Sequence, residues 1–289
     1  NNKNMSYLAK VYDFLIRNNY SRDCIIFGVG GGITCDMTGF IASTFLRGVD
    51  FVLVPTTLLS QVDASIGGKT GVNHKGFKNM IGTFNQPVQV IIDTKFLKSL
   101  SKLEIQCGLM EVIKHGLISD KVFFVWLEKN LKQILSLKPK FIERAIKRSI
   151  EIKADVVSKD EKENGLRAIL NFGHTFGHAL ETIGNNKLYT HGEAVALGML
   201  AATKLSESIS DLDSKVFDRV HSTIKNTGIK VKLKKKIFPK KLIKLMQSDK
   251  KKNNSQLKFI LLENIGKAKI KSVSNEETIE NAIKNSLFY

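Results

Sequence analysis

Apolar positions in the first hundred residues follow the patterns of alternating helices and strands. Residues 5–18 carry apolar side chains at helical spacing, whereas short apolar runs at 24–29, 51–54 and 88–92 are typical of buried parallel strands. A further helix is predicted over 34–46, between the first two strands. Because strands alternate with helices, this part of the chain predicts a parallel α/β domain.

From residue 104 onward the pattern becomes mainly helical. The stretch 141–157 predicts a strongly amphipathic helix. Two apolar runs near the end, 257–262 and 268–273, flank a turn signal and predict a hairpin. We therefore divide the chain into an α/β domain, residues 1–103, and a mainly α-helical domain, residues 104–289.

The composition is that of an ordinary globular protein. Of the 289 residues, 43% are hydrophobic and 25% are charged, which excludes a disordered chain. No apolar run reaches the roughly 18 residues of a membrane span. The N-terminus also lacks a signal pattern, so we expect a cytoplasmic protein without membrane contact. The three cysteines, Cys24, Cys35 and Cys107, lie far apart and predict reduced thiols.

The formal net charge of +18 raises the question of nucleic-acid binding. The excess comes almost entirely from lysines scattered along the chain, and arginine, which contacts phosphates and bases bidentately, is scarce. The sequence therefore favours a protein that does not bind nucleic acid. The positive field would still attract a small anionic substrate.

Three of the six histidines, His174, His178 and His191, fall within 18 residues. The first two are four residues apart, one helical turn on the same face. Imidazoles with a carboxylate are the ligands that a divalent transition metal prefers, with one position left open for chemistry. The HExxH signature of zinc proteases is absent. Gly173 and Gly177 precede two of the histidines and indicate close approach by a ligand or by another backbone. Metal binding or catalysis is favoured over a pair of hydrogen-bonded core histidines.

A glycine cluster, residues 28–32, follows the first strand and opens a helix. Backbone N–H groups at this position can bind a pyrophosphate, although Ile33 departs from the GxGxxG pattern and a tight structural turn is an equal alternative. Gly68-Lys69-Thr70 ends like a P-loop, but Asp63 stands where that motif begins with glycine. Lys69 lies among glycines and could reach a bound ligand, whereas the alternative is a flexible surface loop.

Taken together, these segments closely resemble 3-dehydroquinate synthases over nearly the whole chain. The matching stretches, in order, are 30–36, 46–48, 55–59, 63–73, 78–82, 111–114, 166–178 and 191–194. The resemblance implies a Rossmann-like NAD domain followed by a helical metal-binding domain. It also implies conversion of a seven-carbon phosphorylated keto acid, DAHP, to 3-dehydroquinate and phosphate in the shikimate pathway. NAD would be reduced and regenerated in each turnover, and the enzyme would be a homodimer.

The resemblance also assigns individual residues. A divalent metal, zinc or cobalt, would be held by Glu111, His174 and His191. Arg47 would reach the phosphate site of the neighbouring subunit. The sugar-phosphate substrate would be bound by Lys69, Lys78, Asn79, Lys114, Lys153, Arg167, Asn171, His178 and Lys250. NAD would be held by Gly30, Gly31, Gly32, Ile33, Thr34, Cys35, Asp36, Thr56, Thr57, Asp63, Lys69, Lys78, Phe96, Leu97, Lys98 and Ser99.

This sequence also departs from the family pattern at its N-terminus and at Cys35. Chains of that family extend further at the N-terminus and carry a Gly-Glu-x-x-Lys motif, of which Lys3 would be the last residue. We therefore expect part of the NAD site and the first strands of the sheet to lie outside this sequence. Cys35 stands where glycine is common and should add a Cβ near the pyrophosphate.

Three alternatives stay open beside the synthase. Another sugar-phosphate cyclase, forming an inosose or valiolone-type ring, would use the same site. Glycerol-dehydrogenase-like enzymes share the fold and metal but do not need as many cationic contacts. An inactive truncated remnant would fold without turnover. A partner for the substrate carboxylate, expected at Arg167 or Lys250, favours the synthase.

Overall fold

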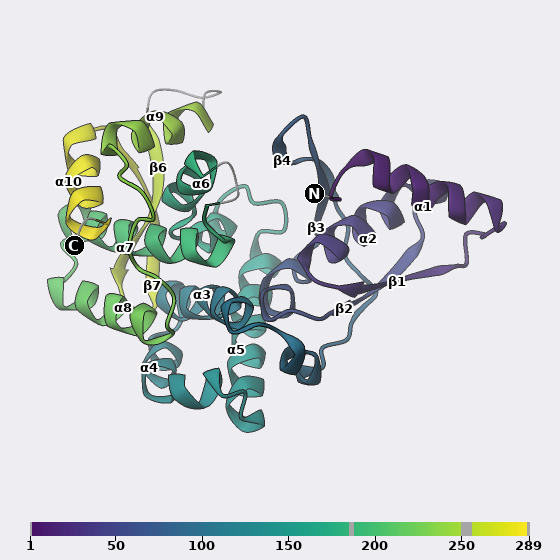
Figure 1. Cartoon of the computed structure of the whole chain (residues 1–289), viewed down its shortest axis with the longest axis horizontal. Helices are drawn as coiled ribbons and strands as arrows, with labels where there is room; N and C mark the ends of the chain where they lie inside the picture. The colour runs from purple at the N-terminus through teal and green to yellow at the C-terminus, as the bar shows by residue number, and fades with distance from the viewer. Residues whose placement is uncertain (1, 185–187, 250–255, 288–289) are drawn as a thin grey trace. The chain divides into compact units, whose positions relative to one another are not determined.

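The computed structural model describes residues 2–184, 188–249 and 256–287. The chain forms two compact units, Asn1–Ile105 and Gln106–Tyr289, which are coloured from purple to blue and from teal to yellow in Figure 1. Within the described residues the first unit is an α/β unit and the second is mainly helical.

The first unit is built on a parallel sheet. Its described strands are β1 (Ile25–Gly30), β2 (Asp50–Pro55) and β5 (Gln89–Val90), in the order β1-β2-β5. The first two coincide with the apolar runs of the sequence, whereas the third is shorter than its run. Helix α2 (Gly32–Thr44) connects β1 to β2, as a parallel pair requires. It ends before residue 46 because Leu46 and Arg47 both have positive φ, at 48° and 69°.

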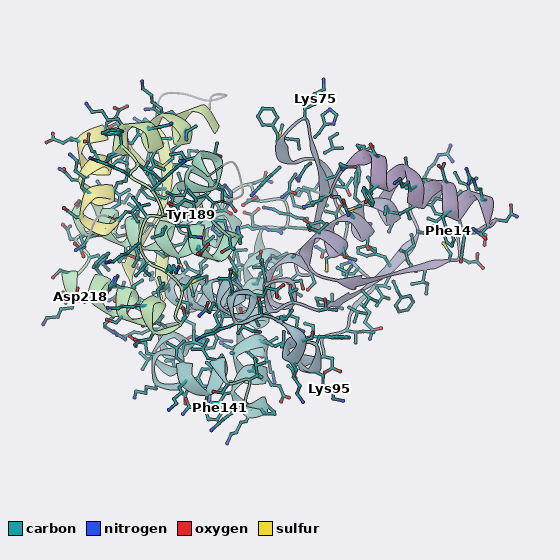
Figure 2. All side chains as sticks on the ribbon, viewed as in Figure 1. Phe14, Lys75, Lys95, Phe141, Tyr189 and Asp218 are labelled. Atoms are coloured by element: carbon teal, nitrogen blue, oxygen red, sulfur yellow. The ribbon has the colours of Figure 1, made fainter. Side chains whose placement is uncertain are left out.

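The core of this unit lies between α2, the sheet and helix α1 (Met5–Arg17). Two buried groups form it: Leu8, Leu15, Phe40, Ile41, Phe45 and Val72, and then Cys35, Ala42, Phe51 and Leu53. Alternate residues of β1 point the other way and are half exposed, with Phe27 at 59% and Val29 at 57%. Figure 2 shows one exposed and one buried aromatic side chain: Phe14 on α1 projects outward, whereas Tyr189 lies within the helical unit.

An antiparallel hairpin completes the first unit. Strands β3 (Lys69–His74) and β4 (Phe77–Phe84) pair closely, and the turn contains Lys75 and Gly76, both at positive φ. Gly71 and Gly82 face each other, and a Cβ on Gly82 would lie 2.0 Å from the Thr70 carbonyl oxygen. The sequence did not predict these strands. The interpretation of Lys69 as part of a flexible loop is therefore wrong.

The second unit packs around one buried helix, α7 (His191–Ser210). Nearly all of its residues from Gly192 to Ser206 are buried, as expected for a helix that is apolar on every face. Three of the described helices pack against it: α6 (His174–Ile183), α8 (Ser214–Asn226) and α10 (Glu276–Leu287). The unit also contains α3 (Lys102–Ser119), α4 (Lys121–Leu135), α5 (Pro139–Lys159) and α9 (Pro239–Asp249). The predicted C-terminal hairpin is present as β6 (Leu257–Asn264) and β7 (Lys267–Val273). No described helix is long and apolar enough to span a membrane.

Helices α6 and α7 touch backbone to backbone. A Cβ on Gly198 would lie 2.0 Å from the carbonyl oxygen of Gly173, and a Cβ on Gly177 would lie 3.1 Å from that of Ala194. Gly173 also has a φ of 80°, which favours glycine. Gly173 and Gly177, which precede the histidines in the sequence, therefore allow α7 to approach α6 closely. This contact places the first residues of α6 and α7 next to each other.

Candidate functional site

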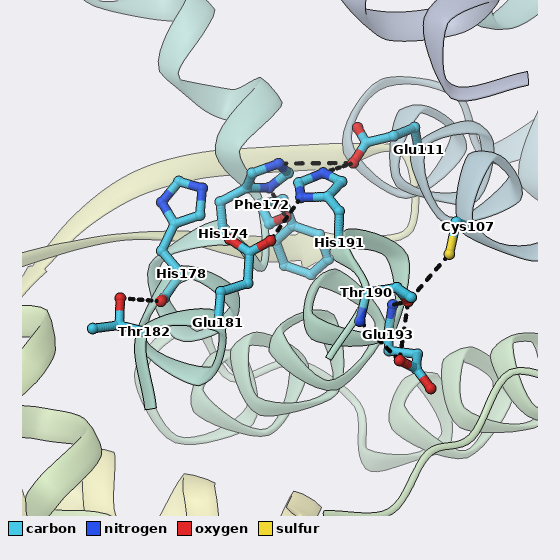
Figure 3. Close-up of polar contacts among 10 residues, drawn as sticks. All are labelled: Cys107, Glu111, Phe172, His174, His178, Glu181, Thr182, Thr190, His191 and Glu193. Carbon is cyan, nitrogen blue, oxygen red and sulfur yellow. Dashed lines mark hydrogen bonds and ion pairs between the residues drawn. The ribbon is translucent and has the colours of Figure 1, made fainter. Parts of the chain in front are cut away.

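Three side chains from three helices converge in the second unit. Glu111 comes from α3, His174 is the first residue of α6, and His191 is the first residue of α7. Their nearest ligand atoms all lie within 4.8 Å of one another. Figure 3 shows both imidazoles turned towards the same carboxylate oxygen, Glu111 Oε1, at 3.7 Å from His174 Nε2 and 3.4 Å from His191 Nε2.

The start of α7 is fixed by a capping box. The Thr190 hydroxyl accepts a hydrogen bond from the backbone N–H of Glu193, whose carboxylate accepts one from the backbone N–H of Thr190. Lys234 donates to the same carboxylate at 2.7 Å. His191 is therefore held at a defined position by local sequence, and the α6–α7 contact brings His174 beside it.

Glu111 is completely buried, so the charge of its carboxylate must be compensated inside the protein. Lys114, one turn further along α3 and equally buried, donates to Oε2. Burial opposes the charged form, but Lys114 and the two imidazoles hold the pKa of Glu111 well below its ordinary value. Among the described residues, Oε1 accepts no hydrogen bond of ordinary geometry. This oxygen is directed at the two histidines.

The second nitrogen of each imidazole faces an acceptor of the protein. His174 Nδ1 lies 3.2 Å from the carbonyl oxygen of Phe172, and His191 Nδ1 lies 3.4 Å from Glu181 Oε1. Burial and the Lys114 charge lower the pKa of His174 to about 3. Burial also disfavours charge on His191, but the carboxylates of Glu111 and Glu181 outweigh it and raise the pKa to about 10. Two imidazoles and one buried carboxylate fit a divalent metal with an open coordination position.

Several predicted cations lie in the same unit. Lys153 on α5 and Arg167 are 6% and 2% exposed, although such side chains are rarely buried unless they are paired. The segment before Arg167 is organised by Asp160, whose carboxylate accepts the backbone N–H groups of Asn164, Gly165 and Arg167 at 2.8–2.9 Å. Arg167 in turn donates to the Glu161 carbonyl. These contacts hold a buried guanidinium in the second unit.

Two further predicted residues border this cluster. His178 is exposed on α6, and its ring centroid lies 5.5 Å from that of His174. Asn171, also exposed, donates to Glu163 Oε1 at 2.7 Å. The spacing of His174 and His178 therefore places two imidazoles side by side, one partly buried and one exposed. The predicted Lys250 lies outside the described residues.

In the first unit, the glycine loop lies beside Thr56 and Thr57. The Thr56 N–H donates to the Gly30 carbonyl at 2.9 Å, and a Cβ on Gly31 would lie 3.3 Å from Thr57 Cγ2. Both segments follow the carboxyl ends of parallel strands, where ligands of such sheets bind. Gly31 is the N-cap of α2 and offers no side chain to the first N–H groups. This end of α2 fits a pyrophosphate.

Cys35, which stands where glycine is common in the family, is a core residue. Its side chain is 1% exposed and packs in the core with Ala42, Phe51 and Leu53, and its thiol lies 3.9 Å from the carbonyl oxygen of Gly30 in the glycine loop. Burial raises the pKa of its thiol to about 12. The expected presence of this Cβ near a bound pyrophosphate stays a prediction.

Lys3 is a residue that the predicted set left out. It is 8% exposed and donates to both Asp36 on α2 and Asn79 on β4. It thus joins one predicted NAD residue to one predicted substrate residue. The signal that could have found it is its place at the end of the Gly-Glu-x-x-Lys motif.

The other predicted residues of the first unit lie on the β3–β4 hairpin, after α2 and on two short helices. Lys69 and Lys78 are exposed on the β3–β4 hairpin, and Arg47 is exposed after α2. Asp63 is half-buried on η2 (Ser60–Ala64). On η3 (Thr94–Ser99), Phe96, Lys98 and Ser99 are exposed, whereas Leu97 is fully buried in the core.

Comparison with known proteins identifies the family. The N-terminal domain of 3-dehydroquinate synthase matches residues 1–107, and its C-terminal domain matches residues 108–252. The chain belongs to the 3-dehydroquinate synthase family. The synthase of Nitrosomonas europaea is 47% identical over 92% of this chain and 72% of its own length. That of Pelagibacter ubique is 46% identical over 99% of this chain and 79% of its own length.

Solved structures agree with this assignment. A 2-epi-5-epi-valiolone synthase from Streptomyces hygroscopicus, with NAD+ and Zn2+ bound, has a TM-score of 0.90 at 27% identity and covers 98% of this chain and 79% of its own. A 2-deoxy-scyllo-inosose synthase with carbaglucose-6-phosphate, NAD+ and Co2+ has a TM-score of 0.89 at 27% identity, covering 99% and 80%. The resemblance and the fold class predicted from the sequence are therefore confirmed.

The buried pair of Glu111 and Lys114 gives the first prediction. Lys114→Met removes the lysine that pairs with a completely buried carboxylate and should lower the free energy of unfolding of the metal-free protein by about 3 kcal/mol. Adding Glu111→Gln removes the unpaired charge and should restore most of this loss. Urea unfolding followed by circular dichroism measures both.

Lys284→Met is the matched control for this experiment, because Lys284 makes an exposed pair with Glu280 on α10. It should change the free energy of unfolding by less than about 1 kcal/mol. A Lys114→Met variant as stable as this control would contradict the assignment of a charged Glu111.

Proposed function

We propose that this chain is a 3-dehydroquinate synthase, which converts DAHP to 3-dehydroquinate and phosphate with NAD and a divalent metal. The observation that carries the proposal is the convergence of Glu111, His174 and His191, with Lys114 beside them. Relatives that are 44–47% identical over most of the chain are named 3-dehydroquinate synthase and support the same activity.

Glu111, His174 and His191 would hold the metal, zinc or cobalt. Bound there, the metal would act as a Lewis acid that acidifies the substrate hydroxyl to be oxidised. The donor set supports this role, because it combines two imidazoles with a buried carboxylate whose Oε1 is directed at them. Structural neighbours with bound Zn2+ or Co2+ support the choice of metals.

NAD would accept hydride from the substrate and return it later in the turnover. Its pyrophosphate would lie against residues 30–36, with Thr56 and Thr57 beside them. Further contacts would come from Asp63, from Lys69 and Lys78 and from residues 96–99. The N-terminus of α2, which lacks a side-chain cap, supports the pyrophosphate position.

The cations of the second unit would bind the anionic substrate. Lys114, Lys153 and Arg167 are buried, and the desolvation of such groups is offset when an anion binds them. We assign the substrate carboxylate to Arg167, because a guanidinium can form two parallel hydrogen bonds to it. Asn171, His178, Lys69, Lys78, Asn79 and Lys250 would contact the substrate's hydroxyls and phosphate.

The substrate is tested by comparing DAHP with sugar phosphates that lack the carboxylate. With NAD and Zn2+ or Co2+ added, kcat/KM should be higher for DAHP by roughly a hundredfold or more, because a carboxylate-free substrate leaves buried Arg167 without its anion. Phosphate release and formation of 3-dehydroquinate measure turnover. Arg167→Met should reduce this preference.

Faster turnover of a carboxylate-free sugar phosphate would assign the chain to another cyclase. The similarity to valiolone and inosose synthases favours this as the second candidate. The absence of turnover with every substrate, in the presence of NAD and metal, would favour the inactive remnant.

The metal site gives a separate prediction. His191→Ala removes one of three ligands and should leave the purified chain with less than about a tenth of the wild-type metal content. His178→Ala, at an exposed position outside the ligand set, should keep the metal but lose turnover. Elemental analysis and the activity assay measure these outcomes. Equal metal content in the His191→Ala and wild-type proteins would exclude this ligand set.

We also propose a cytoplasmic homodimer in which Arg47 reaches the neighbouring subunit's phosphate site. All three cysteines are free thiols, which supports a reducing compartment. Arg47 is exposed and follows Leu46, and both have positive φ. Such backbone strain often marks a functional position.

Mixing experiments test the role of Arg47. Arg47→Ala chains and Lys69→Ala chains should each be nearly inactive, yet their hybrid dimer has one complete site. Equal mixing should therefore restore about a quarter of wild-type activity. Mixing Arg47→Ala chains with the double variant Arg47→Ala/Lys69→Ala provides the control, because no hybrid then has a complete site. No recovery above this control would place Arg47 in its own subunit's site.

A further inference from the structure

Glu181 contacts the imidazole of His191 on the side away from Glu111. Its Oε1 lies 3.4 Å from His191 Nδ1, while Nε2 of the same ring lies 3.4 Å from Glu111 Oε1. Figure 3 shows the ring placed between the two carboxylates. Glu181 is 5% exposed, although a buried carboxylate is costly unless it is hydrogen-bonded or paired. Its position therefore requires a partner, and His191 provides one.

Helix α6 carries both His174 and Glu181, seven residues apart. Residues at this spacing lie on one face of a helix, so α6 presents one imidazole and one carboxylate to the same region. His174 uses the Phe172 carbonyl, in the segment just before α6, as the acceptor for its own Nδ1. The two imidazoles thus have different acceptors, a neutral carbonyl for His174 and a carboxylate for His191.

The ring of His191 has the greater need of such a contact. Its side chain is 31% exposed, compared with 12% for His174, and it belongs to the first residue of α7. A more exposed ring is held less firmly by packing. A proton fixed on Nδ1 leaves Nε2 with its lone pair available, and a carboxylate acceptor makes that nitrogen a stronger donor to a metal.

We propose that Glu181 is a positioning residue for the metal site: its carboxylate accepts the Nδ1 proton of His191, orients the ring and strengthens Nε2 as a ligand. This inference rests on the proposed function, because it takes Glu111, His174 and His191 as the ligand set. Glu181 itself does not contact the substrate or the metal. It acts through His191.

Metal affinity, rather than activity, is the decisive measurement. The affinity of the chelator-treated chain for Co2+ is measured by competition with a chromophoric chelator, and the visible absorption of bound Co2+ reports the coordination geometry. Glu181→Ala removes the acceptor and should weaken Co2+ binding about 10- to 100-fold. Glu181→Gln keeps an uncharged acceptor of the same size and should weaken it roughly 3- to 10-fold, because charge-assisted hydrogen bonds are about twice as strong as neutral ones.

Two further variants make the result specific. Glu128→Gln is the control, because Glu128 on α4 is a partly buried carboxylate of the same unit that pairs with Arg219. It should bind Co2+ like the wild type. His191→Ala tests the ligand set itself. If it binds Co2+ like the wild type, the proposed metal site fails, whatever the Glu181 variants do.

The inference is overturned if His191→Ala loses Co2+ but both Glu181 variants stay within twofold of wild-type affinity. It is also overturned if Glu128→Gln loses as much affinity as Glu181→Ala, because the effect would then be a general loss of stability. A graded loss from the wild type through Gln to Ala, with an altered Co2+ spectrum and an unchanged control, supports it. Thermal unfolding of the metal-free variants shows whether each is folded. If Glu181→Ala is unfolded, Glu181→Gln tests the inference.

Discussion

The buried carboxylate of Glu111 is the constraint around which the second unit is organised. A charge without access to water must be compensated by the protein, and Lys114 and two imidazoles do so here. One oxygen is taken by Lys114, and the other is directed at His174 and His191. The arrangement stabilises the negative charge and leaves an oxygen in the position that a divalent metal requires.

This geometry depends on how closely two helices approach. Gly173 and Gly198 allow α6 and α7 to touch through their backbones, and any Cβ at Gly198 would collide with the opposite carbonyl. The capping box of Thr190 and Glu193 then fixes the residue at which α7 begins. Helix starts are well suited to this purpose, since a cap defines the position of the first residue. Both candidate histidine ligands are first residues of helices.

In the first unit, too, the start of a helix forms part of a candidate site, in this case for an anion. Gly31 begins α2 without a side-chain cap, and the turn beside Thr56 and Thr57 brings two strand ends together. Lys3 ties Asp36 to Asn79, so groups assigned to the nucleotide and to the substrate share one buried ammonium. The proposed binding of NAD and of a phosphorylated acid therefore relies on positive charge in both units.

The sequence by itself determined the α/β and helical patterns of the two parts, the helical spacing of His174 and His178, and the resemblance that named Glu111. These signals lie within short segments, or in motifs that follow one another in a fixed order along the chain, so the sequence alone contains them. Only the tertiary structure decided that residues 69–84 form a hairpin, because their small and polar side chains lack a clear two-residue alternation. It alone decided that Cys35 faces the core and that Glu181 contacts His191. Such contacts join residues on different elements. Their geometry is set by how the elements pack, and the periodicity of a single segment gives no information about that packing.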